Sequence, residues 1–302
     1  MSRALFAFAA AGILSAGALL SASTRPALAD GFSDMMIGYR FGSSYREPAN
    51  PGNISKNIID FQYVNGGKYG GNFLNVDTLI SDAKDPAASG GGGAQEIYLV
   101  YRHEFSLGGL TGHSWAFGPV RNVGLTVGGD LNTKNDAFGA RVRKLVVGPT
   151  FEFRMKGYAN LTLGAIMENN HNAIVNNLNI TNPNPVPGAL LNPAIPGTSN
   201  VVFTPAYRVE AAWGLPFKMG LPVKFQGFAN YTGPKGKDGF GAQTVPELLT
   251  ESSLMIDVGS TTGKAGKVFV GLGYQFWKNK FGNAPGVGTQ ANVLQVLTEL
   301  HI

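Results

Sequence analysis

The sequence has no cysteine, few charged residues and, beyond its first thirty residues, no long apolar run. The lack of cysteine excludes a disulfide framework, thiol chemistry and thiolate metal sites. Charged residues make up 14% of the chain and form no basic cluster, so nucleic acid is not an expected partner. No later stretch approaches the roughly 18 apolar residues that a membrane helix needs. If this chain crosses a membrane, it must do so with strands.

The first segment has the features of a secretory signal peptide. Arg3 precedes a nearly continuous apolar run, and an Ala-Leu-Ala triplet at 27–29 forms a small-x-small cleavage site. We therefore expect residues 1–29 to be removed on export, leaving a mature chain of residues 30–302. An uncleaved anchor helix is the alternative reading of the same run.

The clearest pattern in the mature chain is a two-residue alternation. Every odd position from Phe203 to Leu215 is apolar or aromatic, and the even positions are small, polar or charged. After a short turn the alternation resumes from Val223 to Tyr231. Because side chains on a strand switch faces at every residue, this segment predicts an antiparallel hairpin with one apolar and one wet face.

Twelve such stretches follow one another, each long enough for a tilted strand to cross a bilayer. The links after the second, sixth, eighth and tenth are short, whereas those after the odd-numbered stretches are irregular. The link at 107–119 is the exception, and the Asn/Pro-rich segment 169–200 is a long extracellular loop. The predicted strands are 34–43, 57–65, 72–82, 95–106, 121–131, 141–154, 158–168, 203–215, 223–232, 249–261, 268–278 and 291–302.

An even number of strands, with loops on one rim and turns on the other, is typical of an outer-membrane barrel. The fold class is therefore all-β: a transmembrane antiparallel up-and-down β-barrel of twelve strands. A soluble β-sandwich would also alternate, but twelve successive strands of this length are unusual for one. The predicted location is the outer membrane of a Gram-negative bacterium.

No motif for catalysis or cofactor binding is present. The four histidines lack a metal-ligand spacing, so no metal or cofactor is expected. His103 lies on the predicted outer face between Tyr101 and Phe105, where a lipid-facing hydrolase would carry a Ser/His pair. Its expected neighbours offer no serine, so we favour an interfacial histidine over an enzyme.

The remaining chemistry lies on the inward faces, which carry both signs of charge together with several aromatic residues. The lumen of a twelve-stranded barrel is narrower than that of a sixteen-stranded porin. Such a lumen could be plugged by its own salt bridges, or it could be a narrow pore for a flat, polar, uncharged solute such as a nucleoside. The inward charged positions are Arg40, Asp60, Asp77, Glu96, Arg102, Glu104, Arg143, Glu152, Arg154, Glu168, Arg208, Glu210, Lys224 and Asp257.

Inward direction and mid-strand position select eight candidate pore-lining residues. Stacking candidates are aromatic and hydrogen-bonding candidates are polar or charged. The first group is Phe73, Tyr98 and Phe228, and the second is Asp77, Arg102, Arg208, Glu210 and Asn230. If Arg208 and Glu210 form a lumen pair at the constriction, Arg208→Ala should change ion selectivity more than it changes folding.

Four segments of the chain resemble the nucleoside-specific channel (Tsx-like) family of outer-membrane proteins. They begin at Tyr69 (YGGNFLNVD), Gly118 (GPVR), Asn132 (NTKNDAF) and Lys224 (KFQGFANYTGPKGKDGF), and the last is the most specific. The resemblance implies a monomeric twelve-stranded barrel that passes nucleosides and deoxynucleosides. The chain departs from the usual pattern at its end, where Ile302 replaces the terminal Phe of most outer-membrane barrels.

The sequence therefore predicts a narrow, passive outer-membrane channel for nucleosides and deoxynucleosides. The alternative is a non-conducting structural barrel or a general small-solute pore. The expected partners are the nucleosides, outer-membrane lipid and lipopolysaccharide, and the barrel-assembly machinery, with no nucleic acid.

Overall fold

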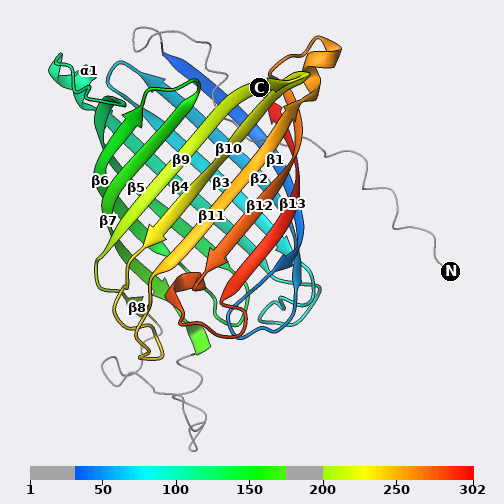
Figure 1. Ribbon diagram of the computed structural model, residues 1–302. Coiled ribbons are helices and arrows are strands. Elements are labelled where there is room, and N and C mark those ends of the chain that lie inside the picture. The colour runs from blue at the N-terminus through cyan, green and yellow to red at the C-terminus, as the bar shows by residue number, and fades with distance from the viewer. Residues whose placement is uncertain (1–30, 175–199) are drawn as a thin grey trace, which may run out of the picture.

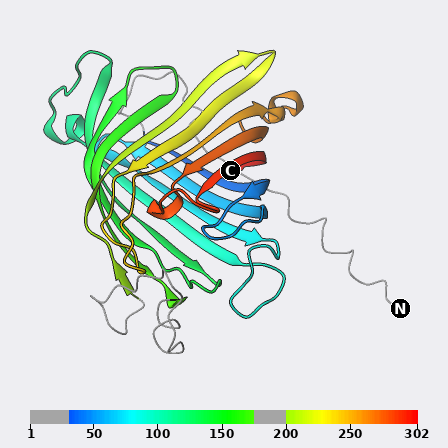
Figure 2. The same cartoon turned by 60° about the horizontal axis from the view of Figure 1, so that its bottom comes forward.

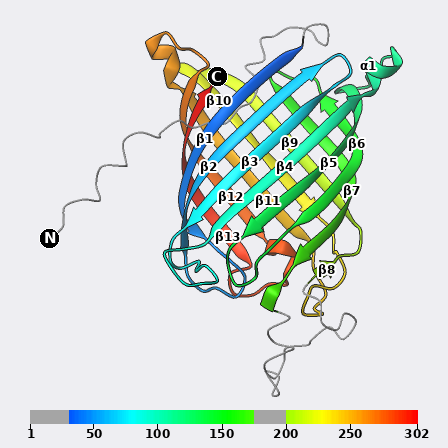
Figure 3. The ribbon, with the colours of Figure 1, turned by 180° about the vertical axis from the view of Figure 1, so that it is seen from behind.

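The computed structural model describes residues 31–174 and 200–302, which form one antiparallel sheet closed on itself (Figures 1 and 3). The predicted signal peptide lies outside the described residues. The strands are β1 (Phe32–Tyr45), β2 (Ile54–Gly67), β3 (Gly70–Ser81), β4 (Gln95–Ser106), β5 (Val120–Lys134), β6 (Arg143–Phe153), β7 (Tyr158–His171), β8 (Asn200–Val202), β9 (Ala206–Met219), β10 (Leu221–Thr232), β11 (Glu247–Asp257), β12 (Val268–Lys278) and β13 (Gln290–His301).

The closure of the sheet confirms the predicted twelve-stranded barrel. Each wall strand pairs antiparallel with its neighbours along the chain, and β1 pairs with β13 to close the ring. The short strand β8 pairs only with the end of β7, which itself pairs with β6 and β9 in the wall. Strand β8 therefore extends one rim and is not a thirteenth strand of the barrel wall.

The two rims differ in the length of their connections. Tight links after β2, β6 and β9 lie on one rim, together with the start of β1 and the end of β13. The link between β4 and β5, which broke the predicted pattern, lies on this short-turn rim and contains helix α1 (Leu107–Thr111) (Figure 1). The longer connections and β8 lie on the opposite, long-loop rim, which comes forward in Figure 2. No helix in the described residues is long and apolar enough to cross a membrane.

Most predicted strand bounds differ from the structure by one to three residues, and the largest differences are at the ends of β9 and β11. Strand β9 begins at Ala206 and runs through Pro216 to Met219, because the turn needs only Gly220, whose φ of 77° suits glycine. Strand β11 stops at Asp257, where its side chain accepts a hydrogen bond from the Ser260 backbone N–H (3.1 Å). This cap starts the 3₁₀ helix η1 (Val258–Thr262) in place of the predicted strand end.

The predicted loop at 169–200 is shorter than expected at both ends. Residues up to His171 continue β7, and Asn200 begins β8. Residues 175–199 lie outside the described part of the chain.

The outer wall is apolar along nearly its whole height. Away from a bulge at Arg121, the charged residues at outward positions of the described wall strands are Arg143 and Lys278. Arg143 is the first residue of β6 and Lys278 the last of β12, so both lie at the long-loop rim. The inward position predicted for Arg143 is wrong, because it shares its face with the exposed Leu145.

Outward tyrosines pair with asparagines on the neighbouring strand. The Tyr39 hydroxyl donates to Asn57 Oδ1 (2.6 Å), and the Tyr274 hydroxyl donates to Asn292 Oδ1 (2.8 Å). Each pair satisfies polar groups that would otherwise face an apolar surrounding unpaired. Tyrosine on an apolar wall with its hydroxyl engaged is typical of a membrane-facing surface.

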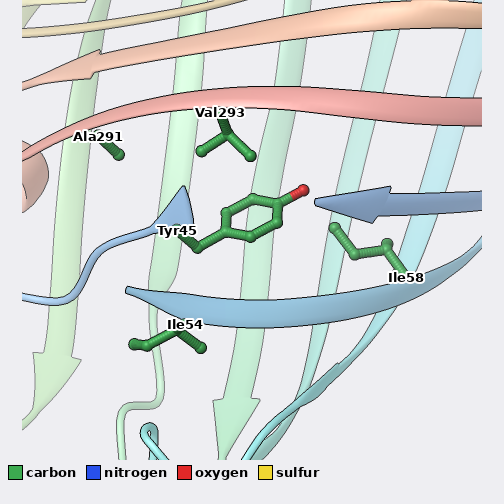
Figure 4. Close-up of a cluster of buried hydrophobic side chains, with 5 residues drawn as sticks. All are labelled: Tyr45, Ile54, Ile58, Ala291 and Val293. Atoms are coloured by element: carbon green, nitrogen blue, oxygen red, sulfur yellow. The ribbon is translucent and has the colours of Figure 1, made fainter. Parts of the chain in front are cut away.

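The inward face of the barrel contains small apolar clusters as well as charges. Near the long-loop rim, side chains from β1, β2 and β13 pack together inside the wall (Figure 4). The Tyr45 hydroxyl in this cluster accepts a hydrogen bond from Gln295 Nε2 (2.9 Å). The cluster fills one side of the lumen with hydrocarbon, so the polar lining is not continuous around the barrel. Its members are Tyr45, Ile54, Ile58, Ala291 and Val293.

Candidate functional site in the barrel lumen

One cavity of about 1390 Å³ occupies the lumen. Its lining reaches from Gly66 and Gly157 at the short-turn rim to Glu47 and Lys280 at the long-loop rim. A cavity lined by residues of both rims has the form of a passage through the barrel. The charged residues of the cavity that form ion pairs with Arg40 or Arg102, directly or through a shared carboxylate, are called the waist here, and they form two clusters.

The first waist cluster surrounds Arg40, which projects inward from β1. Its Nη2 donates to Asp77 Oδ2 on β3 (2.6 Å), and its Nη1 donates to Glu251 on β11. Asp60 on β2 lies 3.6 Å from Arg40 Nε. One guanidinium thus faces three carboxyl groups, and the Arg40–Glu251 pair spans the curve of the wall formed by β12 and β13. This side of the waist is acidic.

The second waist cluster is organised by Arg102 on β4. Its Nη2 donates to Glu210 Oε1 (2.7 Å) and its Nε to Glu210 Oε2 (3.0 Å), which is a two-pronged contact with a strand four places around the barrel. Its Nη1 donates to Asp130 Oδ1 on β5 (2.8 Å). Arg208 Nε also donates to Glu210 Oε1 (2.7 Å), so Arg208 and Glu210 are in contact in the lumen. Charges on this side of the waist are close to balance.

Glycines on the strands between β4 and β9 allow Arg102 to lie against the wall. A Cβ added to Gly128 would lie 2.7 Å from Arg102 Cδ, so the arginine stem passes directly over this residue. Gly148 and Gly164 follow on β6 and β7 and approach each other closely, with 2.5 Å between an added Gly148 Cβ and Gly164 Cα. At these three positions the wall beneath the Arg102–Glu210 pair therefore carries no side chain.

All eight sequence-predicted site residues line the cavity. Tyr98, Arg102, Arg208 and Glu210 belong to the second waist cluster, with the Tyr98 hydroxyl donating to Asp130 Oδ2 (3.2 Å). The Asn230 side-chain oxygen accepts a hydrogen bond from Arg208 Nη2 (3.1 Å) in the amide orientation in which the nitrogen donates to the Ala229 carbonyl oxygen (3.2 Å). Their contact with a solute stays a prediction.

The other three predicted residues lie on separate parts of the wall. Asp77 belongs to the Arg40 cluster. Phe73 is the register partner of Arg102, and Phe228 is the register partner of Glu251. An aromatic face therefore lies beside a charge in each cluster, and the two phenylalanines come from β3 and β10, which lie on opposite sides of the ring.

Sequence reasoning missed two members of the waist. Asp130 accepts from Arg102, and Lys144 lies 3.7 Å from Asp130 Oδ2. The signal was available, because Asp130 has the same parity as the inward Asn132, and Lys144 alternates with the outward Leu145. What the pattern could not supply was the partner of each charge across the lumen.

A third group of charges holds together the loops at the long-loop rim. Glu47 Oε1 accepts from Lys56 Nζ (2.8 Å) and lies 3.2 Å from Lys280 Nζ and 3.5 Å from Lys134 Nζ. Burial by itself raises the pKa of Glu47, but the three ammonium groups outweigh it and hold that pKa well below its usual range. Burial, opposed by Glu47 and reinforced by Lys56 and Lys134, lowers the pKa of Lys280 to about 8.

His103, the residue weighed for catalysis, faces outward without a nucleophile. Its Nδ1 lies 2.8 Å from Asn72 Oδ1, and its ring packs edge-on against Phe105 at 4.2 Å. Asn72 Oδ1 also accepts from the Tyr101 hydroxyl (2.6 Å). The outward direction of His103 agrees with the alternation of the sequence, and its interfacial role stays a prediction. Over residues 31–174 and 200–302, no three His, Asp or Glu side chains are grouped so that they could hold a metal ion.

Comparisons with known proteins give similarities of fold only. No family model and no curated protein matches the chain. Among solved structures it is similar to the NanC porin, with 7% identity over 87% of this chain and 98% of that one and a TM-score of 0.44. It is also similar to the KdgM porin (8% identity, 88% and 98% covered, TM-score 0.39) and to the translocator domain of the autotransporter NalP from Neisseria meningitidis (9%, 90% and 88%, 0.38). Similarities of this size carry no conclusion about substrate.

Proposed function

We propose that this protein is an outer-membrane channel through which small polar solutes diffuse, and that nucleosides are among them. The observation that carries the proposal is the pairing of an apolar outer wall with a cavity of about 1390 Å³ lined from rim to rim. The outer wall supports a membrane location because strands in a bilayer show apolar side chains to the lipid and polar ones to the lumen. Leu272 and Leu294, for instance, are 58% and 65% exposed on that wall.

The waist supports solutes that are polar but carry little net charge. Arg102, Arg208 and Glu210 engage one another, so a neutral solute can exchange hydrogen bonds with them without a large desolvation cost. Phe73 and Phe228 offer apolar ring faces next to these charges. A nucleoside combines a flat base that stacks on such rings with a sugar that hydrogen-bonds.

The experiment is single-channel recording on the purified barrel in a planar bilayer. We expect a small conductance that adenosine and thymidine reduce at concentrations at which free ribose has no effect. If ribose reduced the conductance as much as the nucleosides do, the protein would be a general small-solute pore without nucleoside preference. The absence of any conductance would favour the other candidate, a barrel in which the ion pairs Arg40–Glu251 and Arg102–Glu210 act as structural ties between separate strands.

A further inference from the structure

Two exposed arginines, Arg141 and Arg143, lie at the long-loop end of β6. Arg143, the first residue of β6, shares the outward face of the strand with Leu145. Arg141 is exposed and lies two residues earlier, in the link that enters β6. Away from the Arg121 bulge, Arg143 is one of two charged residues at outward positions of the described wall strands, and Arg141 lies just beyond it on the loop side. Two residues of chain separate their Cα atoms, which therefore lie at most about 7 Å apart. Such a distance allows both guanidinium groups to reach one phosphate.

Arg143 is held in place by the backbone beside it. Its Nη1 donates to the carbonyl oxygens of Asn132 (3.0 Å) and Val142 (2.7 Å). These two bonds fix the guanidinium at the edge of the β5–β6 pair and use only one of its nitrogens. Among the described residues, neither Arg141 nor Arg143 forms a salt bridge, so their charges are not neutralised by the protein.

The surface around the two arginines changes character within one residue pair. Arg143 faces Leu131 on one neighbouring strand and Asn169 on the other. One step further from the loops, Leu145 pairs with Met167. Leu131, Leu145 and Met167 are 43%, 44% and 49% exposed. The two arginines therefore lie at the long-loop edge of a strip of exposed apolar side chains.

We propose that this end of β6 binds the phosphate of a membrane lipid, with the acyl chains of that lipid lying over Leu131, Leu145 and Met167. Arginine suits the phosphate because its planar fork can donate two hydrogen bonds to neighbouring oxygens. No acidic side chain lies at an outward position of the described wall strands to compete for the arginines. Two arginines without a salt-bridge partner, at the long-loop edge of an apolar strip, match a lipid phosphate in charge and the acyl chains in polarity. A free phosphate would contact only the arginines.

The inference concerns the outer wall and relies only on the membrane location in the proposed function, not on conduction. The test is native mass spectrometry of the folded barrel in detergent with diphosphoryl lipid A. The double variant Arg141→Gln and Arg143→Gln should bind lipid A roughly thirtyfold more weakly. Each basic residue near a charged lipid surface raises the affinity by about a factor of five. The double variant Arg141→Lys and Arg143→Lys should retain part of the affinity, because it keeps the charge but not the fork.

The matched control removes two charges from the opposite rim. Lys156 and Lys218 are exposed there, and their joint replacement by Gln should leave lipid binding unchanged. Three results would overturn the proposal: equal loss in this control, undiminished binding by the arginine-to-glutamine variant, or equal binding of a dephosphorylated lipid A. Inorganic phosphate that competes as well as the lipid would overturn the role of the apolar strip. A barrel that binds the lipid as expected but does not conduct would leave this inference standing while the proposed channel failed.

Discussion

The substitution Leu272→Arg tests whether hydrocarbon surrounds the barrel. Leu272 lies near the middle of β12, between outward Val270 and Tyr274, and is 58% exposed. An arginine at the bilayer midplane on the lipid face of a barrel costs about 2–4 kcal/mol, which falls to about 0–1 kcal/mol near the interface. We therefore expect Leu272→Arg to lower the free energy of unfolding by about 3 kcal/mol.

The matched control is Gln290→Arg at the rim of the same wall. Gln290 is the register partner of Lys278, which already places a positive charge at that height. This substitution should change the free energy of unfolding by about 1 kcal/mol at most. Reversible urea unfolding in phosphatidylcholine vesicles, followed by tryptophan fluorescence, measures both variants. Equal effects at the two positions would contradict the membrane placement, because a soluble barrel has no reason to distinguish depth.

Three further predictions concern the waist and the loops. Replacing Arg102 by Met should remove one positive charge from its cluster, so the channel should become more selective for cations, as read from the reversal potential in a KCl gradient. An unchanged potential would place Arg102 outside the ion path. Phe228→Ala should weaken the block by nucleosides by about 1–3 kcal/mol of lost stacking, whereas Phe225→Ala, on the outward face of the same strand, should leave it unchanged. The pKa of Lys280 is lowered from 10.5 to about 8 by burial, so the folded barrel binds fewer protons than the unfolded chain between these values, and its stability should rise with pH across that window. Lys280→Met should remove this rise in the urea midpoint, and a rise of the same size in the variant would assign it to another group.

The fold could be predicted because each strand carries its own signal. The predicted bounds of β4 and β12 match the structure, since strict alternation there ends at glycine- or lysine-rich links. The misplaced end of β11 shows the limit of that signal. Residues 258–261 continue the apolar pattern, but the Asp257 carboxylate captures the Ser260 amide and starts a helical turn instead.

The site was predicted in part for the same reason. Parity alone placed Phe73, Tyr98, Phe228 and the five polar candidates on the lumen side, because the direction of a side chain on a strand is a local property. Arg143 was placed inward against its own parity, and the structure returns it to the outer wall with Leu145. Sequence spacing offered no way to see which charges would meet.

The sequence by itself determined the strands, their faces, the two kinds of rim and the sign of each inward charge. These follow from period-two alternation and turn chemistry, which act over a few residues. Only the tertiary structure decided that Arg102 reaches Glu210, 108 positions away in the chain, and that Arg40 reaches Glu251. Those contacts depend on how the sheet curves and closes, and on the glycines at 128, 148 and 164 that leave the wall flat beneath the Arg102 bridge. Curvature and closure belong to the whole ring of strands, so no local stretch of sequence contains them.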